Sequence, residues 1–168
     1  MASIAETKLK SMKTPRRLYL MRHGQAETPV NGGESELTTA GRTTIEQQAE
    51  RIAALLEREA VPLQRIYHSG KKRAAQTAEI VNARVAPTLK AEARDGLKPN
   101  DDPQALLEEL QHMQQTTLFV SHLPFIPALV RLLTDEPINI QLETIPAGTL
   151  IALQRDADGW HITSILST

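Results

Sequence analysis

An arginine and a histidine close an apolar run near the start of the chain, in the stretch LYLMRHGQAE at residues 18–27. A strand that is buried on both faces is a continuous apolar run, and charged residues normally lie in the loop that follows it. Arg22 and His23 come where this strand should end, and Gly24 lets the backbone turn sharply behind them. Because open α/β sheets bind ligands outside the carboxyl ends of their strands, Arg22 and His23 are candidate functional residues.

A second candidate lies in the basic stretch SGKKRAAQTAE at residues 69–79. Arg73 falls at the start of a predicted helix with Lys71 and Lys72, where cations gain nothing from the helix dipole. Three cations at this positive end are explained if an anion binds there, since free backbone amides attract the same charge. Arg73 is the best anion ligand of the three, because a guanidinium grips phosphate oxygens through two parallel hydrogen bonds. The alternative is a solvated basic turn.

His122 is the third candidate, in the stretch SHLP between a very apolar strand and a helix that begins at Pro124. A lone histidine at such a junction is more often a structural residue whose ring nitrogens have hydrogen-bond partners within the protein. In a parallel sheet, however, the carboxyl ends of the strands lie side by side, so His122 is expected to meet the earlier candidates. Two arginines, two histidines and a helix N-terminus make a pocket for a dianion.

The elements that position these residues alternate between strands and helices. Strands are predicted at 16–23, 65–69, 87–92 (weak), 116–121, 149–155 and 160–166, the last two joined by a hairpin turn at Asp158-Gly159. Helices are predicted from Thr38 or Thr39 to Arg58, over 71–84, from an Asp102 N-cap to about Met113, and over 123–133. This order predicts a three-layer α/β/α fold, with a mainly parallel central sheet and an antiparallel edge.

Length and composition narrow the class of protein. The 168 residues suffice for one core but not for two ordinary domains, so residues 16–168 are expected to form a single domain. Residues 1–15 are expected to form a flexible extension, with a short docked helix near residues 4–12 as the alternative. A net charge of -1 and 3% aromatic residues argue against nucleic-acid or membrane partners. No apolar stretch suggests a membrane span or signal peptide, which favours the cytoplasm.

As an ordered set, these motifs resemble the histidine phosphatase superfamily, which includes phosphoglycerate mutases and acid phosphatases. The matching residues are RHG after the first strand, LTxxG at 37–41, SxxxRAxQTAE at 69–79 and SHLP at 121–124. The resemblance covers the chain from about Leu18 to the tail hairpin and implies a phosphoglycerate mutase-like fold.

The resemblance implies a role for each candidate. His23 is then the nucleophile, which attacks phosphorus and forms a phosphohistidine intermediate that water hydrolyses. Arg22, Arg73 and His122 then hold the phosphoryl oxygens and stabilise their charge. Fixed cations do this work without a metal or cofactor, and the histidines lack a close metal-ligand spacing.

Within the superfamily, LxPxxD at 97–102 resembles the small bacterial phosphohistidine phosphatases, the SixA-like group. In mutases a longer stretch before the second histidine carries a glutamate that protonates the leaving oxygen. Glu92 is the only glutamate between Pro87 and Asp102 here, and its surroundings do not resemble that motif. A phosphoramidate needs no strong acid, because its nitrogen leaves as imidazole. Asp102 is then a weak acid, a residue that orders water, or simply the N-cap before Pro103.

Gly70 and the loop at 28–36 are two features that the resemblance does not account for. The family usually has proline where this chain has Gly70, which leaves the loop before Arg73 less constrained. The loop at 28–36 is expected to rim the site, where Glu27 and Glu34 either repel small anions or contact a basic protein surface.

The leading hypothesis is a phosphatase for phosphohistidine on a protein such as a phosphotransfer domain, with phosphate or other oxyanions binding the site. The alternatives are a small-molecule phosphomonoesterase and a non-catalytic phosphate-binding module.

Overall fold

The computed structural model describes residues 16–135 and 137–168, and the predicted extension at 1–15 lies outside this range. Strands and helices alternate along the described chain, as the sequence predicts. In order they are β1 (Arg16–Arg22), α2 (Thr39–Glu59), β2 (Arg65–His68), α3 (Lys72–Val85), β3 (Glu92–Ala93), α4 (Gln104–His112), β4 (Thr117–Ser121), α5 (Phe125–Leu133), the 3-10 helix η1 (Leu142–Thr144), β5 (Leu150–Asp156) and β6 (Gly159–Leu166).

The strands form one six-stranded sheet in the order β3-β2-β4-β1-β5-β6. Strand β1 pairs in parallel with β4 and antiparallel with β5, and β2 pairs in parallel with both β4 and β3. The tail strands β5 and β6 pair antiparallel. The prediction of a mainly parallel sheet with an antiparallel edge is therefore confirmed.

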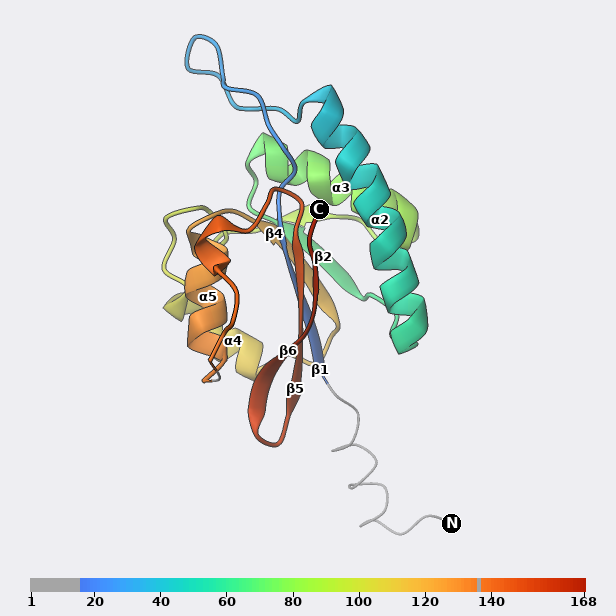
Figure 1. The fold of residues 1–168 in the computed structure, drawn as a ribbon, viewed down its shortest axis with the longest axis vertical. Helices are drawn as coiled ribbons and strands as arrows, with labels where there is room; N and C mark the ends of the chain where they lie inside the picture. The colour runs from blue at the N-terminus through green and yellow to red at the C-terminus, as the bar shows by residue number, and fades with distance from the viewer. Residues whose placement is uncertain (1–15, 136) are drawn as a thin grey trace.

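Helices cover both faces of the sheet, with α2 and α3 on one side and α4 and α5 on the other (Figure 1). One core lies beneath α2 and α3 and includes Ile45, Ile52 and Val81, all 0% exposed. The second lies beneath α5 and α4 and includes Leu129 and Leu110, also 0% exposed. Burial on two faces explains why β4 is a continuous apolar run, since all five of its residues are buried.

Helix α2 shows how local sequence sets an element boundary. The hydroxyl of Thr38 accepts a hydrogen bond of 2.8 Å from the backbone N–H of Gly41, which confirms Thr38 as the N-cap. Gly41 is required for packing, because a Cβ atom there would lie 2.2 Å from the carbonyl oxygen of Gln25. The loop after β1 therefore presses closely against the first turn of α2.

The predicted strand over 87–92 is wrong for most of its length, since β3 contains only Glu92 and Ala93. The side chain of Asn82 donates hydrogen bonds of 2.9 Å to the carbonyl oxygens of Ala86 and Leu89. These bonds hold the chain after α3 in a turn, and Pro87 has no N–H to give to a neighbouring strand. Pairing with β2 begins only beyond this turn.

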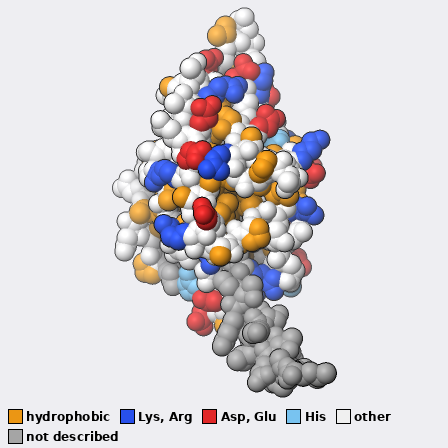
Figure 2. Space-filling model, turned by 90° about the vertical axis from the view of Figure 1, so that its right-hand side faces the viewer, with side chains coloured by type: hydrophobic (Ala, Val, Ile, Leu, Met, Phe, Trp, Pro, Cys, Tyr) orange, Lys and Arg blue, Asp and Glu red, His pale blue; other side chains and the backbone are white. Residues whose placement is uncertain are grey.

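Charges of both signs are interspersed over the α2 and α3 side of the molecule (Figure 2). No single-sign field covers this face. In the described part of the chain, no helix is both long enough and apolar enough to cross a membrane. The apolar stretch Phe125-Ile126-Pro127, which could have served as core or as partner surface, is buried.

Candidate active site

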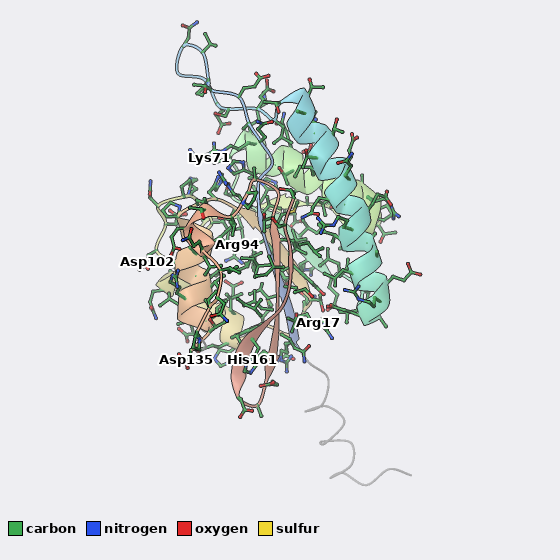
Figure 3. All side chains as sticks on the ribbon, viewed as in Figure 1. Arg17, Lys71, Arg94, Asp102, Asp135 and His161 are labelled. Atoms are coloured by element: carbon green, nitrogen blue, oxygen red, sulfur yellow. The ribbon has the colours of Figure 1, made fainter. Side chains whose placement is uncertain are left out.

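The candidate residues meet at the carboxyl edge of the parallel strands. Because β1 and β2 flank β4 in the sheet, His23 and His122 follow neighbouring strands, and the loop after β2 leads into Arg73. The ring centroids of His23 and His122 are 5.0 Å apart. Figure 3 shows Lys71, which stands just before α3, at this end of the sheet and Arg17 towards the opposite end.

Both ring nitrogens of His23 form hydrogen bonds, Nδ1 as the donor and Nε2 as the acceptor. Its Nδ1 lies 2.7 Å from the carbonyl oxygen of Gly24, which accepts only, so Nδ1 carries the proton in this contact. Its Nε2 accepts a hydrogen bond of 3.3 Å from Nε of Arg73. The Nε2 lone pair therefore faces a guanidinium, which is where a phosphoryl group would be attracted.

The environment keeps this imidazole neutral. Burial lowers the pKa of His23 to about 4, outweighing the hydrogen bond to Gly24, and the positive charges of Arg73 and Arg22 lower it further. A neutral ring at physiological pH retains the Nε2 lone pair, which an imidazole needs in order to act as a nucleophile.

Arg73 reaches the site because α3 is bonded to the loop after β1. The hydroxyl of Thr77 accepts a hydrogen bond of 3.0 Å from the backbone N–H of Gly24 and donates one of 2.8 Å to the carbonyl oxygen of Arg73. Thr77 is 0% exposed, and it was not among the candidate residues that the sequence indicated. The feature of the sequence that could have indicated this role is the place of Thr77 in the QTAE stretch.

The loop before Arg73 depends on the glycine at position 70. Gly70 has a φ of +88°, which proline cannot adopt. Its backbone N–H donates a hydrogen bond of 3.1 Å to Nδ1 of His68, and proline has no N–H to do so. The loop thus has a conformation that proline would not permit, and it leads to Arg73, which bonds to His23.

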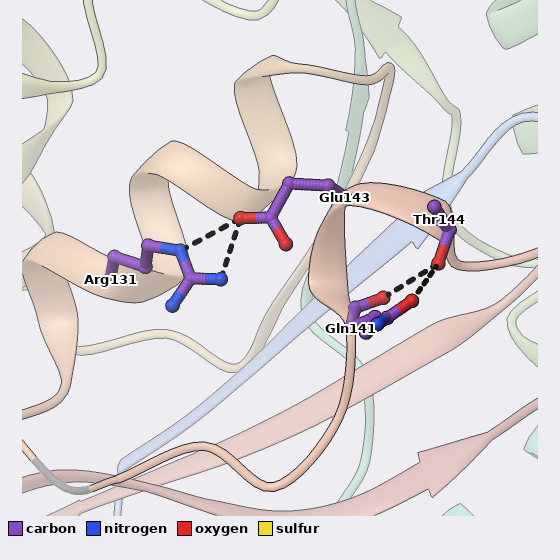
Figure 4. A network of polar contacts seen from close by, with 4 residues as sticks. All are labelled: Arg131, Gln141, Glu143 and Thr144. Carbon is purple, nitrogen blue, oxygen red and sulfur yellow. Dashed lines mark hydrogen bonds and ion pairs between the residues drawn. The ribbon is translucent and has the colours of Figure 1, made fainter.

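Arg22 is held by the segment that follows η1. Its Nη1 donates a hydrogen bond of 2.7 Å to the carbonyl oxygen of Ile145, which follows η1. Helix η1 is in turn tied to α5, because Arg131 donates hydrogen bonds of 3.0 and 2.5 Å to Glu143 (Figure 4). Burial lowers the pKa of Arg22, although a guanidinium stays charged at neutral pH.

His122 is 1% exposed and has one ring contact that the sequence analysis did not anticipate. Its Nε2 lies 2.6 Å from the hydroxyl oxygen of Ser69. Burial, together with the positive charges of Arg73, Lys71 and Arg22, lowers the pKa of His122 to about 3. Both histidines of the site are therefore neutral at pH 7.

Two buried nitrogen atoms at the site lack partners. Nε of Arg22 and Nδ1 of His122 form no hydrogen bond with the part of the chain that the structure describes. Buried polar groups are normally paired, so the unpaired N–H of Arg22, in a site that also holds Arg73, fits a ligand rich in acceptor oxygens. The arrangement can therefore hold a tetrahedral oxyanion against Nε2 of His23.

A cavity of about 420 Å³ adjoins the site and shares Ser69, Gly70 and Lys71 with the loop that precedes Arg73. Its other lining residues are Glu34, Ala93, Arg94, Asp95 and Lys98. The opposite charges make this cavity suited to a polar group attached to the phosphoryl group. The second lysine of the basic stretch, Lys72, forms an ion pair of 2.7 Å with Glu36 instead.

Neither carboxylate considered as a proton donor belongs to the cluster around His23. Asp102 is exposed at the outer margin of the fold, where its side chain accepts a hydrogen bond of 3.0 Å from the backbone N–H of Gln104 (Figure 3). The predicted N-cap is therefore displaced by one residue, because α4 begins at Gln104 and its N-cap residue is Pro103. Glu92 is exposed on the edge strand β3. Within residues 16–135 and 137–168, no group of three or more acidic or histidine side chains is placed to hold a metal ion.

Comparisons with known proteins agree with this architecture. Residues 18–99 match the histidine phosphatase superfamily (branch 1). Over 68 residues the chain is 44% identical to a 6-phosphofructo-2-kinase/fructose-2,6-bisphosphatase of Caenorhabditis elegans, which is 39% of this chain but only 14% of that protein.

Solved structures share the fold over most of their length. The protein histidine phosphatase SixA, complexed with tungstate, superposes with a TM-score of 0.76 and 24% identity over 90% of this chain and 96% of that one. A mycobacterial glucosyl-3-phosphoglycerate phosphatase, complexed with VO3, superposes with a TM-score of 0.69 and 19% identity over 91% of this chain and 100% of that one.

Proposed function

We propose that this chain, whose residues 18–99 match the histidine phosphatase superfamily, hydrolyses phosphohistidine on a protein through a phosphohistidine intermediate at His23. The observation that carries this proposal is the orientation of His23. Its protonated Nδ1 is bound by Gly24, and its unprotonated Nε2 faces Arg73.

In the first step, the Nε2 lone pair of His23 attacks phosphorus and the bond from phosphorus to the substrate nitrogen breaks. That bond's electron pair leaves with the substrate imidazole, which takes up a proton from solvent. Arg22, Arg73 and Nδ1 of His122 hold the phosphoryl oxygens while their charge shifts. In the second step, water attacks phosphorus, the bond to Nε2 breaks, and inorganic phosphate leaves while the proton from water passes to solvent.

The choice of a phosphoramidate rests on the leaving group. Imidazole is far less basic than an alkoxide, so its departure does not require a strong, well-placed acid. Asp102 is exposed and bonded to the backbone of Gln104, and Glu92 is exposed at the sheet edge, so neither supports acid catalysis. The fold of the histidine phosphatase SixA supports the same substrate class. The proposal includes a phosphotransfer protein as substrate and the cytoplasm as the place of the reaction.

A phosphomonoesterase of small molecules is the second candidate, and the cavity beside the site supports it. Glu34 and Asp95 line that cavity and could protonate an alkoxide leaving group. The glucosyl-3-phosphoglycerate phosphatase that shares this fold is consistent with such a reaction.

Labelling with ³²P-phosphohistidine peptide and with a ³²P-phosphoserine peptide of the same sequence separates these candidates. Reactions are quenched at alkaline pH, where a phosphoramidate survives. Transfer of label from the phosphohistidine peptide to the wild type, and its loss in His23→Ala, would support the proposal. His112→Ala, which removes an exposed histidine on α4, is the matched control.

Turnover of the phosphoserine peptide that falls in Glu34→Gln or Asp95→Asn would instead favour the monoesterase. Binding of both peptides without turnover of either would refute the assignment as an enzyme.

A further inference from the structure

Ser69 contacts the site and has no part in the reaction as proposed so far. It is 2% exposed, and its hydroxyl oxygen lies 2.6 Å from Nε2 of His122. The same oxygen accepts a hydrogen bond of 3.2 Å from the backbone N–H of Lys71, the residue that precedes α3. Ser69 therefore joins the start of α3 to the ring of His122.

The hydrogen-bond inventory indicates which partner donates to the other. A serine hydroxyl has one proton to give and accepts through its lone pairs, one of which faces the N–H of Lys71. Among the described residues, Nε2 of His122 is the acceptor within reach of the hydroxyl proton. If His122 donated instead, the serine proton would be buried without a partner, which is unfavourable.

We propose that Ser69 is a positioning residue that holds His122 in the tautomer protonated at Nδ1, so that Nδ1–H donates a hydrogen bond to a phosphoryl oxygen. The inference rests on the proposed function, because it assigns His122 a part in binding the phosphoryl group. Nδ1 lies across the ring from the contact with Ser69, and it is buried without a partner in the described chain.

The tautomer matters because His122 has only one ring proton at neutral pH. Burial and the surrounding positive charges lower its pKa to about 3, so the doubly protonated ring, which donates from both nitrogens, is rare. Phosphoryl oxygens accept hydrogen bonds, so a lone pair on Nδ1 would repel them, whereas an N–H binds them. Ser69 thereby supplies specificity for an anion without adding a charge.

Side-chain ¹⁵N NMR on the uniformly labelled full chain reports the tautomer directly. The protein has five histidines, and comparison with His122→Gln assigns the signals of His122. We expect the wild type to show a protonated Nδ1 and an unprotonated Nε2. A wild-type spectrum with the proton on Nε2 would overturn the inference, whatever happens to any variant.

Binding of inorganic phosphate to variants measures the consequence. Ser69→Ala should shift His122 towards the Nε2–H tautomer and weaken phosphate binding about tenfold, the effect of impairing one hydrogen bond to a charged group. Ser69→Thr keeps the hydroxyl and should restore both. If Ser69→Ala leaves the tautomer and the affinity unchanged, Ser69 does not act in this way.

Ser121→Ala is the matched control. Ser121 is also buried and precedes His122 directly, but its hydroxyl donates to the carbonyl oxygen of Leu97 at 2.5 Å. Its removal should lower stability and leave the His122 tautomer as it was. If phosphohistidine turnover is absent while the tautomer and phosphate results appear as expected, the proposed function fails and the assignment of Ser69 stands.

Discussion

Lowering the pH from 7 to 5 should reduce the free energy of unfolding by about 4 kcal/mol, through His23 and His122 together. In the unfolded chain both rings have ordinary pKa values near 6.5 and are almost fully protonated at pH 5. In the folded chain burial and neighbouring cations hold their pKa values at about 4 and about 3, so both stay neutral.

The sign follows from proton counting. Between about pH 6.5 and pH 4 the unfolded state binds more protons than the folded state, so stability rises with pH in this window and is lost as pH falls. Each histidine contributes about 2 kcal/mol between pH 7 and pH 5, from about 1.4 pH units at about 1.36 kcal/mol each. Burial also lowers the pKa of His68, which acts in the same direction.

Urea unfolding at both pH values measures the change, and the protein's single tryptophan, Trp160, provides a buried probe at 5% exposure. His122→Gln should remove about half of the pH dependence, and the exposed His112→Gln should leave it intact. A free energy of unfolding that is equal at pH 7 and pH 5 would refute the argument. The argument would also be refuted if the His23→Asn, His122→Gln double variant lost as much free energy of unfolding between pH 7 and pH 5 as the wild type.

Three further substitutions test how the site is held. Gly70→Pro should lower kcat/KM for the phosphohistidine peptide about tenfold or more, because proline cannot adopt a φ of +88° or donate a hydrogen bond to His68. An unchanged kcat/KM would mean that this loop does not position the site. Thr77→Val should lower the free energy of unfolding in urea by about 1–3 kcal/mol, because it leaves the N–H of Gly24 unpaired. Thr77→Ser keeps the hydroxyl and should leave the free energy of unfolding nearly unchanged. Arg131→Ala should leave the free energy of unfolding nearly unchanged, because its ion pair is half exposed, and a clear loss would show that η1 depends on it.

Much of the fold was predictable because it depends on local pattern. Apolar runs bounded by turn residues specify the strands, and the alternation of strands with amphipathic helices specifies a parallel sheet. The boundary of α2 followed from the capping threonine Thr38. The strand expected over 87–92 failed because the bonds from Asn82 to Ala86 and Leu89 compete with pairing, and such bonds leave little trace in periodicity.

For the site, the sequence by itself determined which side chains to consider. Arg22, His23, Arg73 and His122 carry chemistry that ordinary strand ends lack, and the rule that parallel strands share one carboxyl edge was enough to bring them together. Their roles in the reaction remain part of the proposed function.

Only the tertiary structure decided how those side chains are oriented and held. The carbonyl of Ile145 that binds Arg22, the hydroxyl of Thr77 that anchors α3 and the contact of Ser69 with His122 all join residues more than 50 positions apart. Hydrogen bonding depends on distances of a fraction of an ångström and on direction, and a linear pattern of residue types carries neither. The pKa values of the histidines belong to this class as well, because burial by distant parts of the chain sets them.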